Sequence, residues 1–217
     1  MNFDILDDGI REEISQKAGA FLSPLLQGEY SNYGKLTLSE SCRLEVLDLS
    51  SNFDPESSPD LFRRPTHGGE AIWHHQIKQS GLARFYARTV IRDDALPGKK
   101  AEILEVSESR LAKEFDAAIS WLDSEASSPL LSELMTTSNL VRLLIAPRYN
   151  FFSFGLFGSE APALLRPLVA AIPILVPAGE GGEHRGFSPA AADSSIIHPD
   201  DLLRVLMELP VFFGIRG

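Results

Sequence analysis

The spacing of apolar residues predicts three amphipathic helices. Apolar side chains recur every three or four positions near residues 8–27, 108–125 and 199–209. Asp7 or Asp8 can cap the first helix, because a carboxylate oxygen accepts hydrogen bonds from the free backbone N–H groups there. Ser107 or Ser109 can cap the second helix in the same way, and Pro199 suits the first turn of the third. Each apolar stripe indicates a helix with one face packed on a core.

Short runs of alternating or continuous apolar residues predict β-strands. The runs are residues 42–49, 70–79, 83–91, 101–106, 140–146, 151–157 and 172–176. Residues 70–79 and 83–91 are joined by the turn at residues 80–82 and form the clearest hairpin. The densest apolar stretch is 140–158. The other elements should pack around it, because burial of one Phe or Leu side chain contributes roughly 1.5 to 3 kcal/mol.

Together these elements predict an α+β fold. We expect a single mixed, largely antiparallel sheet of about five to seven strands, with the helices packed mainly on one face. At 217 residues the chain can form one domain, residues 1–217, with a helix within residues 1–30 and a sheet-and-helix core over residues 70–217. The Ser- and Pro-rich residues 50–69 predict a long loop, and the glycine-rich residues 179–186 predict a second one.

Composition and charge disfavour some classes of binding partner. The net charge of -10 opposes non-specific binding to nucleic acid or anionic lipid. Only residues 61–100 are basic, with eight Lys or Arg against three Asp or Glu, and nucleic-acid binding through them is a disfavoured third hypothesis. The single Cys42 excludes an internal disulfide. Because the chain also has no leader-like start and no apolar run of roughly 20 residues, we expect a cytoplasmic protein without a membrane segment.

The predicted hairpin carries the best candidate chemistry on its polar side. Alternate residues of a strand share a face, which groups five polar residues: His74, Gln76, Arg84, Tyr86 and Arg88. We call this set the polar hairpin face. Arg84 and Arg88, with Arg142 from a nearby strand, could form a fork for a carboxylate or phosphate. His74 or Tyr86 could exchange a proton there. Pairing of the arginines with glutamates is the competing arrangement, and it would remove the basis for such a site.

The remaining histidine and glycine patterns offer little chemistry. His75 shares a strand face with Trp73 and Ile77, which favours a packed, hydrogen-bonded histidine over a catalytic one. For His74, exposure on a solvated sheet face is the favoured interpretation. The chain lacks the spacings HxxxH, HExxH, GxSxG and GxGxxG, and Cys42 lies inside a predicted strand. We therefore expect no metal, no cofactor and no cysteine nucleophile.

Four phenylalanines occupy both faces of one predicted strand: Phe151, Phe152, Phe154 and Phe157. A second layer, a partner subunit or a ligand must cover some of them, and ordinary core packing is the favoured cover. Because no strong catalytic motif is present, we expect a non-catalytic accessory or protein-interaction domain with a protein partner or a homo-oligomer. The alternative is an enzyme or a binder of an anionic small molecule that uses the polar hairpin face.

Overall fold

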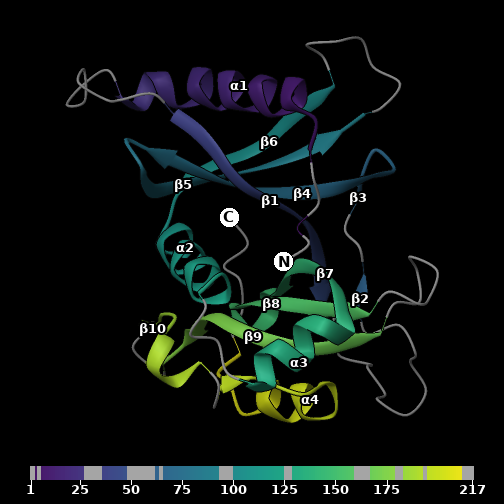
Figure 1. The fold of residues 1–217 in the computed structure, drawn as a ribbon. Coiled ribbons are helices and arrows are strands. Elements are labelled where there is room, and N and C mark those ends of the chain that lie inside the picture. The colour runs from purple at the N-terminus through teal and green to yellow at the C-terminus, as the bar shows by residue number, and fades with distance from the viewer. Residues whose placement is uncertain are drawn as a thin grey trace. The chain divides into compact units, whose positions relative to one another are not determined.

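Figure 1 shows the computed structural model, which describes residues 3, 6–26, 36–47, 62–63, 66–92, 100–124, 129–158, 167–178, 183–192 and 195–211. The chain divides into two compact units. We call residues 3–43 and 65–116 the N-terminal unit, and residues 1–2, 44–64 and 117–217 the C-terminal unit. The expectation that residues 1–217 form one domain stays a prediction.

The N-terminal unit is an antiparallel sheet with helices on it. Its elements are α1 (Asp8–Leu26), β1 (Leu36–Leu47), β3 (Thr66–His67), β4 (Glu70–Gln79), β5 (Leu82–Ile91), β6 (Ala101–Glu108) and the first turns of α2 (Arg110–Leu122). The strand order is β1-β4-β5-β6, and β3 pairs with β4. Ser80 and Gly81 have positive φ and form the tight turn of the predicted β4–β5 hairpin, which the structure confirms.

Helix α1 begins where the sequence predicts and lies across one face of this sheet (Figure 1). The Asp7 carboxylate accepts a hydrogen bond of 2.9 Å from the backbone N–H of Gly9 and caps the helix. Ile14 and Leu22, on the apolar stripe, are buried in a cluster that the sheet completes. The helix is also tied to the sheet by Arg11, whose guanidinium donates to the carbonyls of Leu38 and Ser39.

Helix α2 covers the opposite face of the same sheet. Ser109 caps it, because its hydroxyl accepts a hydrogen bond of 3.1 Å from the backbone N–H of Leu111. Gln76 of β4 donates to the Ala112 carbonyl of α2. The flanking β4 residue Ile77 packs in the cluster beneath α1. Because neighbouring residues of a strand point to opposite faces, the two helices lie on opposite faces of the sheet, and the prediction that helices pack mainly on one face is wrong for this unit.

The C-terminal unit is built on a second set of strands. Its elements are β2 (Phe62–Arg63), the end of β1, the last turns of α2, α3 (Pro129–Thr137), β7 (Ser138–Ala146), a 3-10 turn (Pro147–Tyr149), β8 (Phe151–Gly158), β9 (Leu168–Pro177), β10 (His184–Arg185), a second 3-10 turn (Pro189–Ala191) and α4 (Pro199–Met207). The strand order is β10-β9-β8-β7-β1. Residues 44–46 of β1 pair in parallel with β7, whereas the other pairs are antiparallel.

The structure confirms the largely antiparallel α+β fold, but it contains strands and a helix that were not predicted. Ten strands are hydrogen-bonded within the described residues, more than the expected five to seven. Helix α3 was not predicted, because its short apolar run has no clear helical period. The two-residue strands β2 and β3 lie within the predicted loop at 50–69, and β10 lies within the one at 179–186. The other residues of the 50–69 loop that precede residue 66 lie outside the described ranges.

Helix α4 begins at Pro199, as the sequence predicts, with Asp200 and Asp201 in its first turn. These carboxylates complement the positive end of the helix dipole. Leu202 and Leu206 point from the helix into a cluster of apolar side chains contributed by β7, β8, β9 and the 3-10 turn at Pro147–Tyr149. None of the described helices is long and apolar enough to span a membrane.

Candidate functional site

The structure brings the predicted polar hairpin face together. His74 pairs across the strands with Arg88, and Gln76 pairs with Tyr86. Arg84 alternates with Tyr86 and Arg88 along β5 and therefore shares their side of the sheet. The predicted geometry of this face is correct, and its chemistry depends on which groups remain available to a ligand.

Both arginines of this face are paired with glutamates of β6. Arg84 Nε lies 2.6 Å from Glu108 Oε1, and Arg88 Nη1 lies 3.0 Å from Glu105 Oε2. The remaining candidate, Arg142, is buried in the C-terminal unit. The arrangement is the competing one anticipated from the sequence, so the fork of Arg84, Arg88 and Arg142 loses its basis as an anion site.

Tyr86 also has a carboxylate partner. Its hydroxyl donates a hydrogen bond of 2.6 Å to Glu105 Oε1, and the Arg88 guanidinium lies over its ring at 5.3 Å. Burial, followed by the hydrogen bond to Glu105, raises the pKa of the Tyr86 hydroxyl. Proton release from Tyr86 near neutral pH is therefore disfavoured, which argues against a role as a general base.

His74 is fully buried, so the expectation that it lies exposed on a solvated face is wrong. The physical reason is helix α2, which covers this side of the sheet. The imidazole lies between the rings of Tyr86 and Phe115, with centroid distances of 5.1 and 5.0 Å. Neither ring nitrogen has a hydrogen-bond partner among the described residues. Burial, and then the positive charge of Arg88, lowers the pKa of His74 well below its usual value.

His75 is the packed, hydrogen-bonded histidine that the sequence predicts. Its Nδ1 lies 2.9 Å from Ser41 Oγ, and its Nε2 lies 2.7 Å from Thr89 Oγ1. Burial, and then the positive charge of Arg11, lowers the pKa of His75 to about 3. A neutral imidazole can donate one of these hydrogen bonds and accept the other, so its polar needs are met inside the core.

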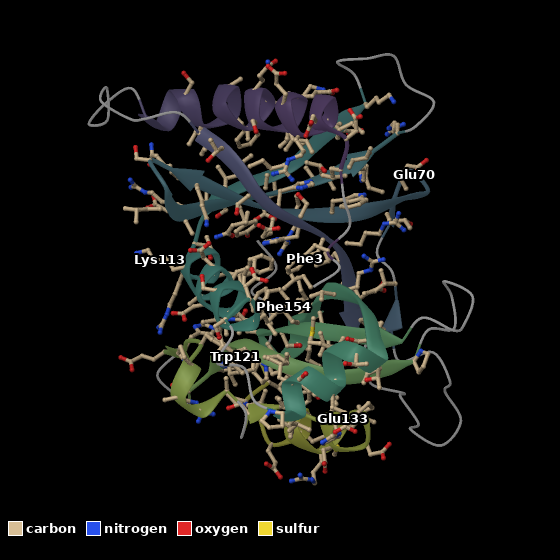
Figure 2. All side chains as sticks on the ribbon, in the orientation of Figure 1. Phe3, Glu70, Lys113, Trp121, Glu133 and Phe154 are labelled. Carbon is tan, nitrogen blue, oxygen red and sulfur yellow. The ribbon has the colours of Figure 1, made fainter. Side chains whose placement is uncertain are left out.

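The phenylalanine-rich strand is largely buried, and Phe151 and Phe157 belong to the apolar cluster of the C-terminal unit. Phe151, Phe154 and Phe157 are 1%, 0% and 6% exposed, and Phe152 is half-buried. Figure 2 labels Phe154 among the side chains on the ribbon. The first three residues are covered by the protein itself, so the interaction surface predicted for Phe151, Phe152, Phe154 and Phe157 needs correction. Only Phe152 retains part of its surface.

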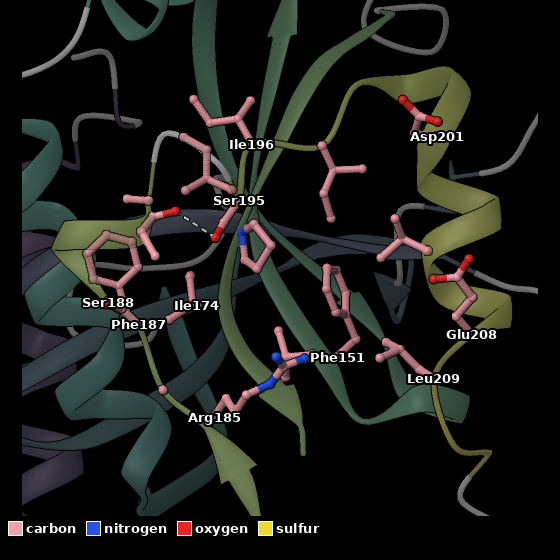
Figure 3. Close-up of a pocket in the computed structure, with 18 of the residues that line it drawn as sticks. Phe151, Ile174, Arg185, Phe187, Ser188, Ser195, Ile196, Asp201, Glu208 and Leu209 are labelled. Atoms are coloured by element: carbon pink, nitrogen blue, oxygen red, sulfur yellow. Dashed lines mark hydrogen bonds between the residues drawn. The ribbon is translucent and has the colours of Figure 1, made fainter. Parts of the chain in front are cut away.

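A pocket of about 840 Å³ lies within the C-terminal unit, between β9, β10 and α4 (Figure 3). We call it the α4 pocket. Much of its wall is apolar and is formed by Phe151, Ile172, Ile174, Val176, Val205 and Leu209. Phe151 comes from β8, and the residues from 172 to 176 come from β9. Leu209 follows the end of α4. The pocket therefore includes Phe151, one of the four phenylalanines of the predicted interaction surface, together with residues from the predicted strand 172–176 and the predicted helix 199–209.

The polar rim of the α4 pocket contains two arginines with different surroundings. Arg204 lies 3.0 Å from the Asp201 carboxylate and 3.4 Å from that of Glu208. Arg185 extends from β10 toward the middle of the pocket (Figure 3). Within the ranges that the structure describes, no side chain forms an ion pair or hydrogen bond with its guanidinium.

Sequence reasoning missed Arg185 because its surroundings are dominated by glycine. The surrounding segment, GEGGEHRG, predicts a solvent-exposed loop with no assigned role. In the structure His184 and Arg185 pair with Pro177 and Val176 of β9, which places Arg185 beside the apolar wall. The only sequence feature that could have indicated this is one basic residue shortly after the apolar run 172–176.

Metal ligands are not grouped in the described part of the chain. No set of three or more His, Cys, Asp or Glu side chains there is arranged to hold a metal ion. Cys42 is buried within β1. The chain matches no protein-family model, and no curated protein or solved structure is significantly similar to it. Its function must therefore be argued from its own residues.

Proposed function

We propose that this protein binds an apolar small molecule in the α4 pocket and acts as a binding protein without catalysis. The observation that carries the proposal is the combination of a volume of about 840 Å³ with a wall that is more apolar than polar. Pockets for small molecules are typically roughly 300 to 1,000 Å³, with apolar walls and a few polar groups that fix orientation.

The pocket wall supports binding because it combines rigid, buried residues with apolar side chains that keep part of their surface, namely Val176, Val205 and Leu209. Ile172 and Ile174 lie on a strand that is paired on both sides within this unit. Phe151 is held in the cluster beneath α4. A pre-formed apolar wall needs little rearrangement to accept a ligand, and the free energy of binding is then not reduced by the entropy of ordering flexible side chains.

The polar groups of the rim support binding rather than catalysis. The carboxylates of Asp201 and Glu208 both contact Arg204, and these three side chains are exposed to solvent. The Ser195 hydroxyl donates to the Ala191 carbonyl, with an O···O distance of 2.8 Å. A nucleophilic serine requires a base within hydrogen-bond reach, and this serine is bonded to a backbone acceptor instead.

Protein interaction is the other function expected from the sequence. Its main support was the phenylalanine-rich strand, and three of those four side chains are buried in the core. A protein partner or homo-oligomer stays a prediction. The α4 pocket gives small-molecule binding a more specific structural basis than any described surface gives a protein partner.

The first test fills the α4 pocket by mutation. Val205 is half-buried and lines the pocket from α4, so Val205→Trp should occupy part of its volume. Met207 is 77% exposed on the same helix and does not line the pocket, so Met207→Trp is a matched control. We expect the neutral dye Nile red to bind the wild type and Met207→Trp, and to bind Val205→Trp at least about tenfold more weakly, as expected when about 1.4 kcal/mol or more of contact is lost.

The measurement is dye fluorescence titrated against each protein, with circular dichroism spectra to establish that the variants are folded. Trp121 offers a second readout in the wild type. Its ring lies 5.6 Å from that of Phe187, which lines the pocket, so occupancy should alter tryptophan emission. The proposal is wrong if the wild type does not bind the dye, or if folded Val205→Trp binds it as well as Met207→Trp does.

A further inference from the structure

We infer that the ligand of the α4 pocket is an amphiphilic monocarboxylate whose carboxylate pairs with Arg185. This inference rests on the proposed function and adds the chemical class of the ligand. It requires that Arg185 is held at the pocket and that its charge is available to a ligand. It also requires that the rest of the pocket favours a ligand with one negative charge over a ligand with none or two.

The backbone holds Arg185 at the pocket. Residues 184 and 185 form β10 and pair with Pro177 and Val176 of β9. Asn150 strengthens this attachment, because its amide nitrogen Nδ2 lies 2.7 Å from His184 Nε2. Neighbouring strand residues point in opposite directions. With His184 directed at Asn150, Arg185 is directed to the other side, where it lines the pocket next to the apolar wall.

The charge of Arg185 is available, in contrast to that of the second arginine on the rim. Arg204 contacts the two carboxylates of Asp201 and Glu208, which offset its charge. Among the described residues no carboxylate contacts Arg185. A guanidinium presents donors in a planar fork that matches a carboxylate in a bidentate pair, and such charge-assisted hydrogen bonds are stronger than neutral ones.

The rest of the pocket favours a single carboxylate with an apolar body. Asp201 and Glu208 place negative charge on the α4 side of the rim and oppose a ligand with a second anionic group. Figure 3 shows Arg185 reaching toward Phe151, with Leu209 beyond it. A ligand whose carboxylate meets Arg185 can thus lay its apolar chain along the half-buried side chains of Val176, Val205 and Leu209, which line the same pocket.

The test compares two ligands of equal chain length, octanoate and octanamide, as competitors of Nile red. In the wild type, octanoate should displace the dye at a concentration about three- to fivefold lower than octanamide, because a charged pair contributes more than a neutral hydrogen bond but Arg185 is exposed to solvent, which limits the gain. In Arg185→Gln the two concentrations should agree within about twofold, while the variant still binds Nile red. Arg185→Lys keeps the charge without the planar fork and should show an intermediate ratio.

The control variant is Arg92→Gln. Arg92 is an exposed arginine of the N-terminal unit that pairs with Glu102, and removing it should leave the ratio at the wild-type value. Equal displacement by octanoate and octanamide in the wild type, or full selectivity retained in Arg185→Gln, would overturn this inference and leave the proposed function standing. If the wild type binds neither the dye nor octanoate, both proposals are wrong.

Discussion

The polar hairpin face of the N-terminal unit and the α4 pocket of the C-terminal unit differ in whether their charged groups are already paired within the protein, although both are built from strands and helices. In the N-terminal unit α1 precedes strands β1, β3, β4, β5 and β6, and α2 follows them. In the C-terminal unit α3 precedes strands β7 to β10, and α4 follows them. On the polar hairpin face the charged groups contact one another, as Arg88 contacts Glu105, and a helix covers His74. The α4 pocket has fewer charges and an apolar wall. Among the residues that the structure describes, no side chain forms an ion pair or hydrogen bond with the guanidinium of its Arg185.

The difference shows that the number of polar residues on a face does not indicate a binding site. A charged side chain that already has a partner in the protein gains little free energy from binding a ligand, because the ligand must replace that partner. An arginine beside apolar surface can form a new pair and bury apolar surface in the same event. We therefore expect mutations of the polar hairpin face to change stability and mutations of the α4 pocket to change binding.

The largest effect should come from the phenylalanine-rich strand that supports the pocket. Phe154 is 0% exposed, so Phe154→Ala should lower the free energy of unfolding by about 3 to 5 kcal/mol. Phe152 is half-buried, and Phe152→Ala should cost less, about 1 to 2 kcal/mol. Urea denaturation of both variants measures the difference. Similar losses for the two variants, or a change of oligomeric state in Phe152→Ala alone, would contradict the assignment of this strand to the core.

An intermediate effect should appear as acid sensitivity of the N-terminal unit. Burial lowers the pKa of His74 and lowers that of His75 to about 3. Between pH 6.5 and the lowered values the unfolded chain binds protons that the folded protein does not, so stability falls as the pH falls. Within this window each histidine lowers the free energy of unfolding by about 1.4 kcal/mol for every unit by which the pH falls. The stability that its neutral form provides is fully present only above about pH 6.5.

His74→Leu isolates one of these two contributions. Between pH 7.5 and pH 5.0 this variant should lose less stability than the wild type, by up to about 2 kcal/mol, because one buried imidazole no longer takes up a proton on unfolding. Urea denaturation at several pH values gives the measurement. His75 remains in place and should preserve part of the acid sensitivity. If the wild type and His74→Leu lose the same stability, His74 is not held neutral in the folded protein.

The smallest effect should come from the two arginines of the polar hairpin face. Their pairs with Glu108 and Glu105 are partly exposed, and such pairs contribute about 0 to 1 kcal/mol each. The octanoate concentration that displaces Nile red from the double variant Arg84→Ala/Arg88→Ala should therefore lie within about twofold of the concentration needed for the wild type. Arg185→Gln is the matched comparison. A loss of octanoate affinity in the double variant as large as that in Arg185→Gln would place the anion site on the polar hairpin face.

Local patterns in the sequence identified most of the elements. The apolar periods predicted helices α1, α2 and α4, with caps at Asp7 and Ser109. The alternating residues of the β4–β5 hairpin also placed His74 and His75 on opposite faces. These features depend on residues within a few positions of one another, so a single sequence contains the relevant information. Helix α3 and the two-residue strands were missed, because short elements are defined by their tertiary partners.

The sequence by itself determined which residues share a strand or a helix face, because the periods of the two elements are fixed by backbone geometry. Tertiary structure alone decided what covers each face. Helix α2 buried His74, glutamates of β6 paired with Arg84 and Arg88, and the attachment of β10 to β9 brought Arg185 to the α4 pocket. Burial and pairing join residues far apart in the chain, and local patterning does not specify such contacts.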